Sequence, residues 1–109
     1  MTHIPIPIFV VRRIYFEEFL AGTKTAEFRR HRAPFTERVF YPGRAVRIAY
    51  GYDNAKPRLG ATVRHFEAKP LREVADMIGF YADMKMDDEI AIIHLMIDPS
   101  EIERLRSRR

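Results

Sequence analysis

Gly22 separates a helix-like stretch of this 109-residue chain from a strand-like one. Before it, in Arg12–Ala21, apolar residues recur every three or four positions, which is the period of an amphipathic helix. After it, Thr25–Arg29 has the two-residue alternation of a short strand. Glycine readily adopts the positive φ that ends many helices. The change of period therefore predicts a helix that ends at Gly22 and a strand that follows closely.

The remaining patterns predict a small α+β fold. Ile6–Val11 is apolar on both faces, which predicts a strand in the middle of a sheet. Further strands are predicted at Ala45–Tyr50, Leu59–Glu67 and Ile90–Ile97, and the last of them is apolar on both faces and so predicted to be buried on both. A helix is expected from Pro70, where the apolar period is clearest, to Gly79. A last helix follows Asp98, which has the spacing of a capping box with Glu101. The order β-α-β-β-β-α-β-α indicates a small α+β barrel.

The connections carry signals of their own. His31–Pro42 is rich in aromatic residues, so it is predicted to pack against the body or to form a lid. Asp53–Pro57 is a hairpin-type connection, and Gly60 in the strand after it allows a bulge or a close backbone approach. Phe80–Glu89 is predicted to be an acidic loop.

Length and composition exclude several classes of protein. The chain fits one domain, residues 1–109, with 99–109 as its C-terminal helix. It contains no cysteine, which excludes disulfides, a thiol nucleophile and a cysteine-based zinc site. No apolar run approaches the roughly 18 residues of a membrane span. Ile4–Val11 contains two prolines and is a poor signal peptide. We therefore expect a cytoplasmic protein with no membrane partner and no cofactor.

Charge is unevenly distributed along the chain. Residues 1–72 hold 14 Lys and Arg against six Asp and Glu, whereas residues 73–100 hold one against seven. Fifteen of the 19 basic residues are arginine, whose planar fork suits phosphates and stacks on bases. This balance slightly favours contact with nucleic acid over an ordinary solvated surface.

Three charged residues follow Gly22 within one short stretch. Lys24 lies in the predicted connection, and Glu27 and Arg29 are two apart, so they project from the same face of a strand. In a site, Lys24 would hold a phosphate or polarise a carbonyl, Glu27 would accept from a base or act as a general base, and Arg29 would orient it. In the structural alternative, Glu27 and Arg29 form a charge pair that ties helix to strand.

Other basic and aromatic residues extend this candidate surface. Alternation places Arg30 and Arg32 on the face opposite Arg29, while neighbouring aromatic residues would supply stacking for RNA. Arg47 and Arg64 lie on adjacent predicted strands and are either part of the basic surface or ordinary exposed positions. The candidate nucleic-acid-binding residues are thus Lys24, Arg29, Arg30, Arg32, Arg47, Arg64 and Tyr50.

The histidines favour packing over catalysis. His65 and His94 are placed on predicted strands, and the apolar surroundings of His94 indicate a satisfied core residue. No metal site is predicted, because the chain lacks histidine and carboxylate residues at ligand spacing. Asp87–Glu89 is more typical of an acidic turn than of a cation site.

The pattern Gly-x-Lys-x-x-Glu-x-Arg at Gly22–Arg29 resembles the signature of the ASCH family. The predicted element order over Ile6–Ile97 is similar to that of the family as well. The resemblance implies a small PUA-like β-barrel of about five strands with two or three flanking helices. It also implies that RNA or a modified nucleotide binds in a basic cleft lined by Lys24, Glu27 and Arg29.

The resemblance leaves other functions open. Some family members are amidohydrolases that use a lysine and a threonine three residues later, but Glu27 occupies that place here, so this activity is not carried over. Other members are ribonucleases, and Lys24 with Tyr50 would support phosphodiester cleavage. Lys24 and Glu27 are the catalytic candidates if the protein is a hydrolase. A third hypothesis is a protein-interaction module that uses Asp83–Glu89 and the basic C-terminal helix.

Overall fold

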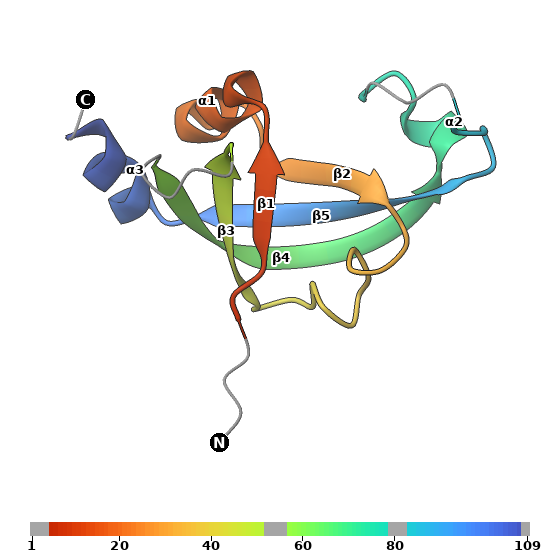
Figure 1. Cartoon of the computed structure of the whole chain (residues 1–109), viewed down its shortest axis with the longest axis horizontal. Helices are drawn as coiled ribbons and strands as arrows, with labels where there is room; N and C mark the ends of the chain where they lie inside the picture. Colours follow the sequence, from red (N-terminus) through yellow and green to blue (C-terminus); the bar gives the residue numbers. More distant parts are fainter. Residues whose placement is uncertain (1–4, 52–56, 79–82, 108–109) are drawn as a thin grey trace.

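The computed structural model describes residues 5–51, 57–78 and 83–107 and has an α+β fold of five strands and three helices. Figure 1 shows the elements in chain order. They are β1 (Ile8–Val11), α1 (Arg13–Ala21), β2 (Ala26–Arg30), β3 (Ala45–Tyr50), β4 (Arg58–Pro70), α2 (Leu71–Val74), β5 (Glu89–Ile97) and α3 (Pro99–Arg106). The predicted order of strands and helices is confirmed, with most boundaries shifted by a few residues.

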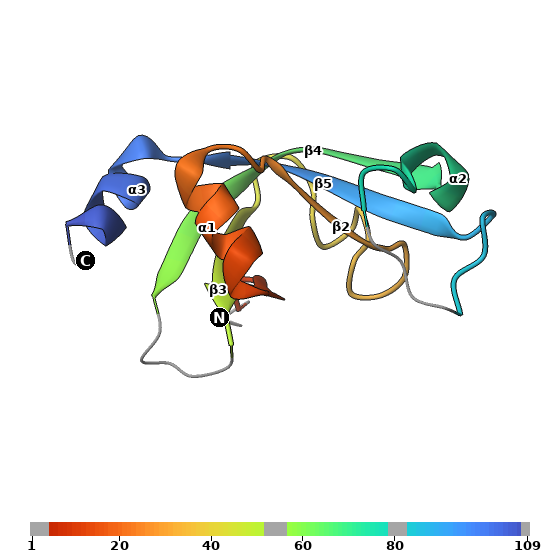
Figure 2. The ribbon, with the colours of Figure 1, turned by 90° about the horizontal axis from the view of Figure 1, so that it is seen from above.

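The strands form one mixed sheet in the order β1-β3-β4-β5-β2. β1 is parallel to β3, and the other pairs are antiparallel. The long strands β4 and β5 run the length of the molecule, with α3 at one end, α2 at the other and α1 between them (Figures 1 and 2). Since β1 and β2 are the two edges, the sheet of the described chain does not close into a barrel.

The central position predicted for the first strand is wrong. β1 is an edge strand that pairs on one side only, with β3. Phe9 and Val11 are nevertheless buried, whereas Ile8 is exposed, and the segment after β2 packs on Phe9. The Phe9 ring stacks on Phe35 at 6.1 Å and on Phe40 at 4.9 Å between centroids. The aromatic connection 31–42 thus belongs to the core.

Buried side chains form two clusters. The larger one lies beneath α1 and between β1, β3 and β4, and its largest members include Phe9, Phe16, Phe19, Phe40, Ile48 and Leu59. The smaller one joins α2 to β5 and consists of Leu71, Val74, Ile90 and Ile92, with partly buried neighbours. Because β5 contributes to both clusters, its predicted burial on both faces is confirmed.

Helix α1 ends as the sequence predicts. Gly22 has φ 79°, in the left-handed region, and its N–H donates to the Phe19 carbonyl at 3.2 Å. The buried face consists of Phe16, Phe19 and Leu20. Tyr15, which the helical period places on the apolar stripe, is exposed instead.

The helix with the clearest apolar period is the shortest in the molecule. α2 has a single turn, Leu71–Val74, and turns follow it. The N–H groups of Leu71 and Arg72 donate to the carbonyls of Asp88 and Met86, so this segment is tied to the chain that leads into β5. The apolar residues at helical spacing still face the smaller cluster, but an irregular backbone carries them there. Gly79 lies outside the described residues.

Gly60 makes the close approach that its position in β4 allows. A Cβ at this position would lie 2.8 Å from Glu101 Oε1 of α3, and the Gly60 N–H donates to that oxygen at 2.9 Å. The register shift in β4 occurs further on, between Val63 and His65. The hairpin connection at Asp53–Pro57 lies almost entirely outside the described residues.

The predicted capping box of α3 is half confirmed. The Asp98 carboxylate accepts from the Ser100 N–H at 2.8 Å, so it caps the helix. The Glu101 side chain does not accept from the Asp98 N–H, because it accepts from the Gly60 N–H and from Arg104 instead. Leu105 is buried and Ile102 packs against the larger cluster. No helix in the part of the chain described here has the length and apolarity needed to cross a membrane.

Candidate functional site

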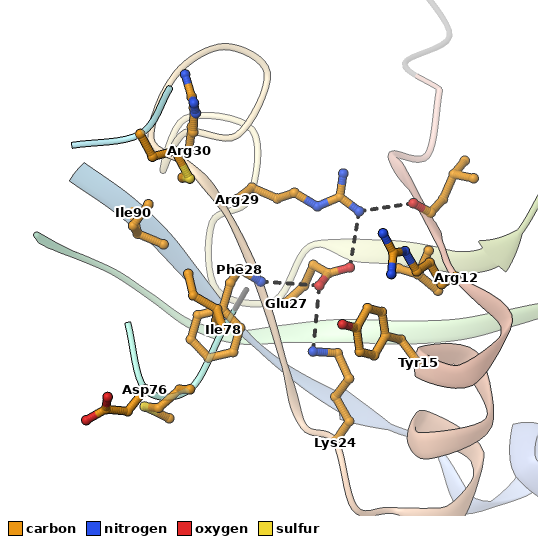
Figure 3. Close-up of a pocket in the computed structure, with 14 residues that line it drawn as sticks. Arg12, Tyr15, Lys24, Glu27, Phe28, Arg29, Arg30, Asp76, Ile78 and Ile90 are labelled. Atoms are coloured by element: carbon orange, nitrogen blue, oxygen red, sulfur yellow. Dashed lines mark hydrogen bonds and ion pairs between the residues drawn. The ribbon is translucent and has the colours of Figure 1, made fainter. Parts of the chain in front are cut away.

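A pocket of about 600 Å³ opens between the two edge strands of the sheet. Its walls come from the end of β1, the start of α1, strand β2 and the segment after α2 (Figure 3). The lining residues are Val10, Val11, Arg12, Tyr15, Lys24, Glu27, Phe28, Arg29, Arg30, Asp76, Met77, Ile78, Met84 and Ile90. The gap left by the open sheet is therefore a site with both charged and apolar walls.

Glu27 is the buried charge of this pocket, with 8% of its side chain exposed. Oε1 lies 3.7 Å from Lys24 Nζ and accepts from the Phe28 N–H at 3.3 Å. Oε2 accepts from Arg29 Nη2 at 3.2 Å. Strand alternation places Glu27 and Arg29 on one face, and the turn after α1 brings Lys24 to the same carboxylate. We call Lys24, Glu27 and Arg29 the Glu27 group.

Lys24 is surrounded by aromatic rings. Its ammonium lies 5.1 Å from the ring centroid of Tyr15 and 5.4 Å from those of Phe19 and Phe28, within the range of cation–π attraction. Its side chain is only 15% exposed. Figure 3 shows the amine directed toward Glu27 alongside Tyr15. The lysine is thus held in a fixed position within the pocket wall.

Arg29 connects the two edges of the sheet. Its Nη2 donates to the Val10 carbonyl of β1 at 3.1 Å as well as to Glu27. Its guanidinium carbon lies 5.1 Å from the ring centroid of Phe35 and 5.8 Å from that of Phe9. A side chain therefore bridges β1 and β2 where no backbone pairing joins them, and it satisfies a carbonyl on the open edge of β1.

The Glu27 group combines both roles that the sequence left open. Its members pair with one another, and they line a pocket. Two cations and one carboxylate leave one net positive charge, and Arg12 and Arg30 add to it from the same lining, partly offset by Asp76. Because both oxygens of Glu27 already accept from neighbours, the carboxylate is better placed to fix Lys24 and Arg29 than to take a proton.

The structure brings four of the predicted site residues to the pocket, namely Lys24, Glu27, Arg29 and Arg30. The other four do not line it. Arg32 follows the end of β2 and is exposed, and Arg47 and Arg64 are exposed on β3 and β4. Tyr50 packs against the Phe16 ring at 4.9 Å, so it belongs to the edge of the core. The basic residues considered for nucleic-acid binding are therefore divided between the pocket and exposed positions outside it.

Sequence reasoning missed two pocket residues on the N-terminal side. Arg12 lies between β1 and α1, where it is exposed and forms the N-terminal boundary of the helix. Tyr15 lies one turn further on. The signal available for Tyr15 was its polar hydroxyl, which suits a position at the rim of a cavity better than a position in the core.

A second part of the pocket lining, on the other face of β2 from Glu27, was also missed. It is contributed by Asp76, Met77, Ile78 and Met84, around the segment that follows α2. The pattern Leu71–Ile78 indicated only a core-facing helix, and nothing local connects it to a site some fifty residues earlier in the chain.

The described histidines, His31, His65 and His94, do not line the pocket. His94 is half-buried rather than in the core, which corrects the prediction. Its Nε2 lies 2.6 Å from Glu67 Oε2, and this hydrogen bond lowers the pKa of Glu67. His31 contacts Glu89 and Glu37, and these hydrogen bonds raise its pKa. No group of three or more potential metal ligands occurs within residues 5–51, 57–78 and 83–107.

The elements proposed for protein interaction are partly occupied by contacts within the chain. In α3, Arg104 donates to Glu101 and to the Arg58 carbonyl, and Arg106 donates to the Leu20 carbonyl. Their basic side chains therefore dock the helix on the body. In the acidic loop, Asp83 pairs with Arg30.

Comparison with known proteins adds no constraint: no family model, curated protein or solved structure matches the chain.

Proposed function

We propose that this protein is an ASCH-like domain of the PUA-like superfamily that binds RNA, or a modified nucleotide within it, in the pocket between β1 and β2. The observation that carries the proposal is a buried carboxylate, Glu27, that holds Lys24 and Arg29 in the wall of a pocket of about 600 Å³. Known ligand pockets span about 300–1,000 Å³, so a nucleotide fits this volume.

The chemistry of the lining supports a nucleotide. Arginine and lysine bind phosphates, and the rings of Tyr15 and Phe28 offer faces for base stacking. Met77, Ile78 and Met84 add apolar surface to the lining. A ligand with an anionic end and a flat, partly apolar end satisfies both walls.

The family assignment rests on the motif at Gly22–Arg29 and on its place directly after the first helix. The assignment implies a closed barrel, whereas the sheet of the described residues is open. Its two edges nevertheless line the same pocket in the curved sheet of Figures 1 and 2, and the Arg29 side chain bridges them.

A hydrolase is the alternative, with Lys24 and Glu27 as catalytic residues. The engaged oxygens of Glu27 favour binding over this alternative. Incubation with RNA and a panel of modified nucleosides separates the two. Turnover that disappears in Glu27→Gln and persists in Arg47→Ala would establish the hydrolase.

Binding is tested by fluorescence anisotropy with a labelled single-stranded RNA over a series of salt concentrations. Arg12→Ala is expected to weaken binding about tenfold and to reduce the slope of log affinity against log salt by about one. Arg47→Ala is the matched control, because it removes an exposed arginine that does not line the pocket. Equal losses in the two variants would contradict a pocket-centred site, and salt-independent binding would contradict a phosphate ligand.

A further inference from the structure

Arg30 lines the pocket apart from the Glu27 group. It follows Arg29 on β2 and therefore projects from the opposite face of the strand. Figure 3 shows it away from Lys24, toward another end of the lining. It forms an ion pair with a residue far along the chain, because Arg30 Nη2 donates to Asp83 Oδ1 at 2.7 Å.

The two partners of this ion pair differ in their surroundings. The Arg30 side chain is 21% exposed, and that of Asp83 is 74% exposed. Asp83 can therefore turn into solvent at little cost, because exposed ion pairs contribute little to stability. Arg30 is the more buried partner and lines the pocket, so it has less room than Asp83 to turn into solvent. A phosphate is the stronger partner for such an arginine, since it accepts two parallel hydrogen bonds from the guanidinium.

We propose that Asp83 occupies the anion-binding position of Arg30 in the free protein and that a phosphate of the ligand displaces it. This inference rests on the proposed function, because it assigns one end of the same pocket to a phosphate. Asp83 is then an internal competitor that lowers affinity for every anion that needs Arg30. Ligands that bind Arg30 more weakly than the carboxylate does gain no affinity from this end of the pocket.

Asp87 provides a matched control for this effect. It lies in the same acidic segment, is also exposed, and pairs with Arg72. Neither Asp87 nor Arg72 lines the pocket. Asp83→Asn and Asp87→Asn thus remove the same charge from nearly the same stretch of chain. Only Asp83→Asn releases Arg30.

The test measures affinity for inorganic pyrophosphate and for a single-stranded RNA at constant ionic strength. Asp83→Asn is expected to raise affinity for both about twofold to fivefold, which corresponds to the loss of one exposed ion pair. Asp87→Asn is expected to leave both affinities unchanged. Arg30→Ala is expected to lower affinity, and the double variant Arg30→Ala/Asp83→Asn should show no gain over it.

Several results would overturn the inference. They are an equal gain in Asp83→Asn and Asp87→Asn, a gain that persists without Arg30, and no gain at all. Asp83→Ser repeats the test if Asp83→Asn does not fold. A gain with pyrophosphate in a protein that fails to bind RNA supports the anion site and counts against the proposed function. RNA affinity that falls in Arg12→Ala but is unchanged in Asp83→Asn supports the proposed function and overturns this inference.

Discussion

Two carboxylates in this molecule have nearly the same partners and different surroundings. Glu27 accepts from a backbone N–H, from Arg29 and from the ammonium of Lys24. Glu101 accepts from the Gly60 N–H and, through both oxygens, from Arg104. The two carboxylates therefore have almost the same kinds of hydrogen-bond and ion-pair partners. They differ in the space that lies beside them.

Glu101 fills the space over Gly60. The absence of a side chain at Gly60 admits the carboxylate, because a Cβ there would lie 2.8 Å from Glu101 Oε1. Glu27 borders a pocket of about 600 Å³. A group of complementary charges thus serves only to stabilise the fold where side chains fill the volume beside it. Where a cavity borders the group, it is a candidate binding site. Sequence motifs report the charges alone.

The largest expected difference between the two groups is in stability. Glu27→Gln leaves Lys24 and Arg29 partly buried without an anion, so the free energy of unfolding is expected to fall by about 3 kcal/mol. Glu101→Gln is expected to cost about 1 kcal/mol, because the Glu101–Arg104 pair is more exposed. Urea denaturation followed by circular dichroism measures both. Equal losses would remove the distinction between the groups.

A second test adds an atom to the filled site. Gly60→Ala places a Cβ 2.8 Å from the present position of Glu101 Oε1, so the carboxylate must turn away and the Gly60 N–H loses its acceptor. The expected loss of stability is about 1–2 kcal/mol. In the double variant Gly60→Ala/Glu101→Gln the losses should not add, because both break the same contact. Additive losses in denaturation experiments would show that the contact contributes little.

The smallest expected effect is a pH dependence at Glu101. Hydrogen bonds from Arg104 and from the Gly60 N–H hold the pKa of Glu101 below its ordinary value of 4.5. Its stabilising contribution is present above pH 4.5 and is lost as the pH falls through the lower pKa of the folded state.

The stability difference between the wild-type protein and Glu101→Gln should therefore shrink on acidification, by less than about 1 kcal/mol. Denaturation at neutral pH and at about pH 3 measures it. A difference that grows in acid would contradict this reading of the contact.

Much of the fold could be predicted from local patterns. The helix that ends at Gly22, the strand Ala45–Tyr50 and the doubly buried β5 follow from periods of 3.6 and 2. The edge position of β1 could not be predicted, because the side chains that cover Phe9 come from the aromatic segment 31–42. The short length of α2 could not be predicted either, because its first N–H groups donate to the carbonyls of Met86 and Asp88.

The candidate site divides in the same way. Two-residue spacing on one strand predicts that Glu27 and Arg29 meet, and they do at 3.2 Å. The partnership of Arg30 with Asp83 spans 53 residues and has no local signal. Arg47 and Arg64 share the residue type of the site residues, but their strands place them outside the pocket.

The sequence alone determined which short segments become helix or strand and which charges share a strand face, because these depend on dihedral preferences and on spacing within a few residues. The tertiary structure decided where a cavity remains. That outcome depends on how two sheet edges and a distant loop meet, since interiors are otherwise closely packed, and here their meeting leaves a pocket beside Glu27.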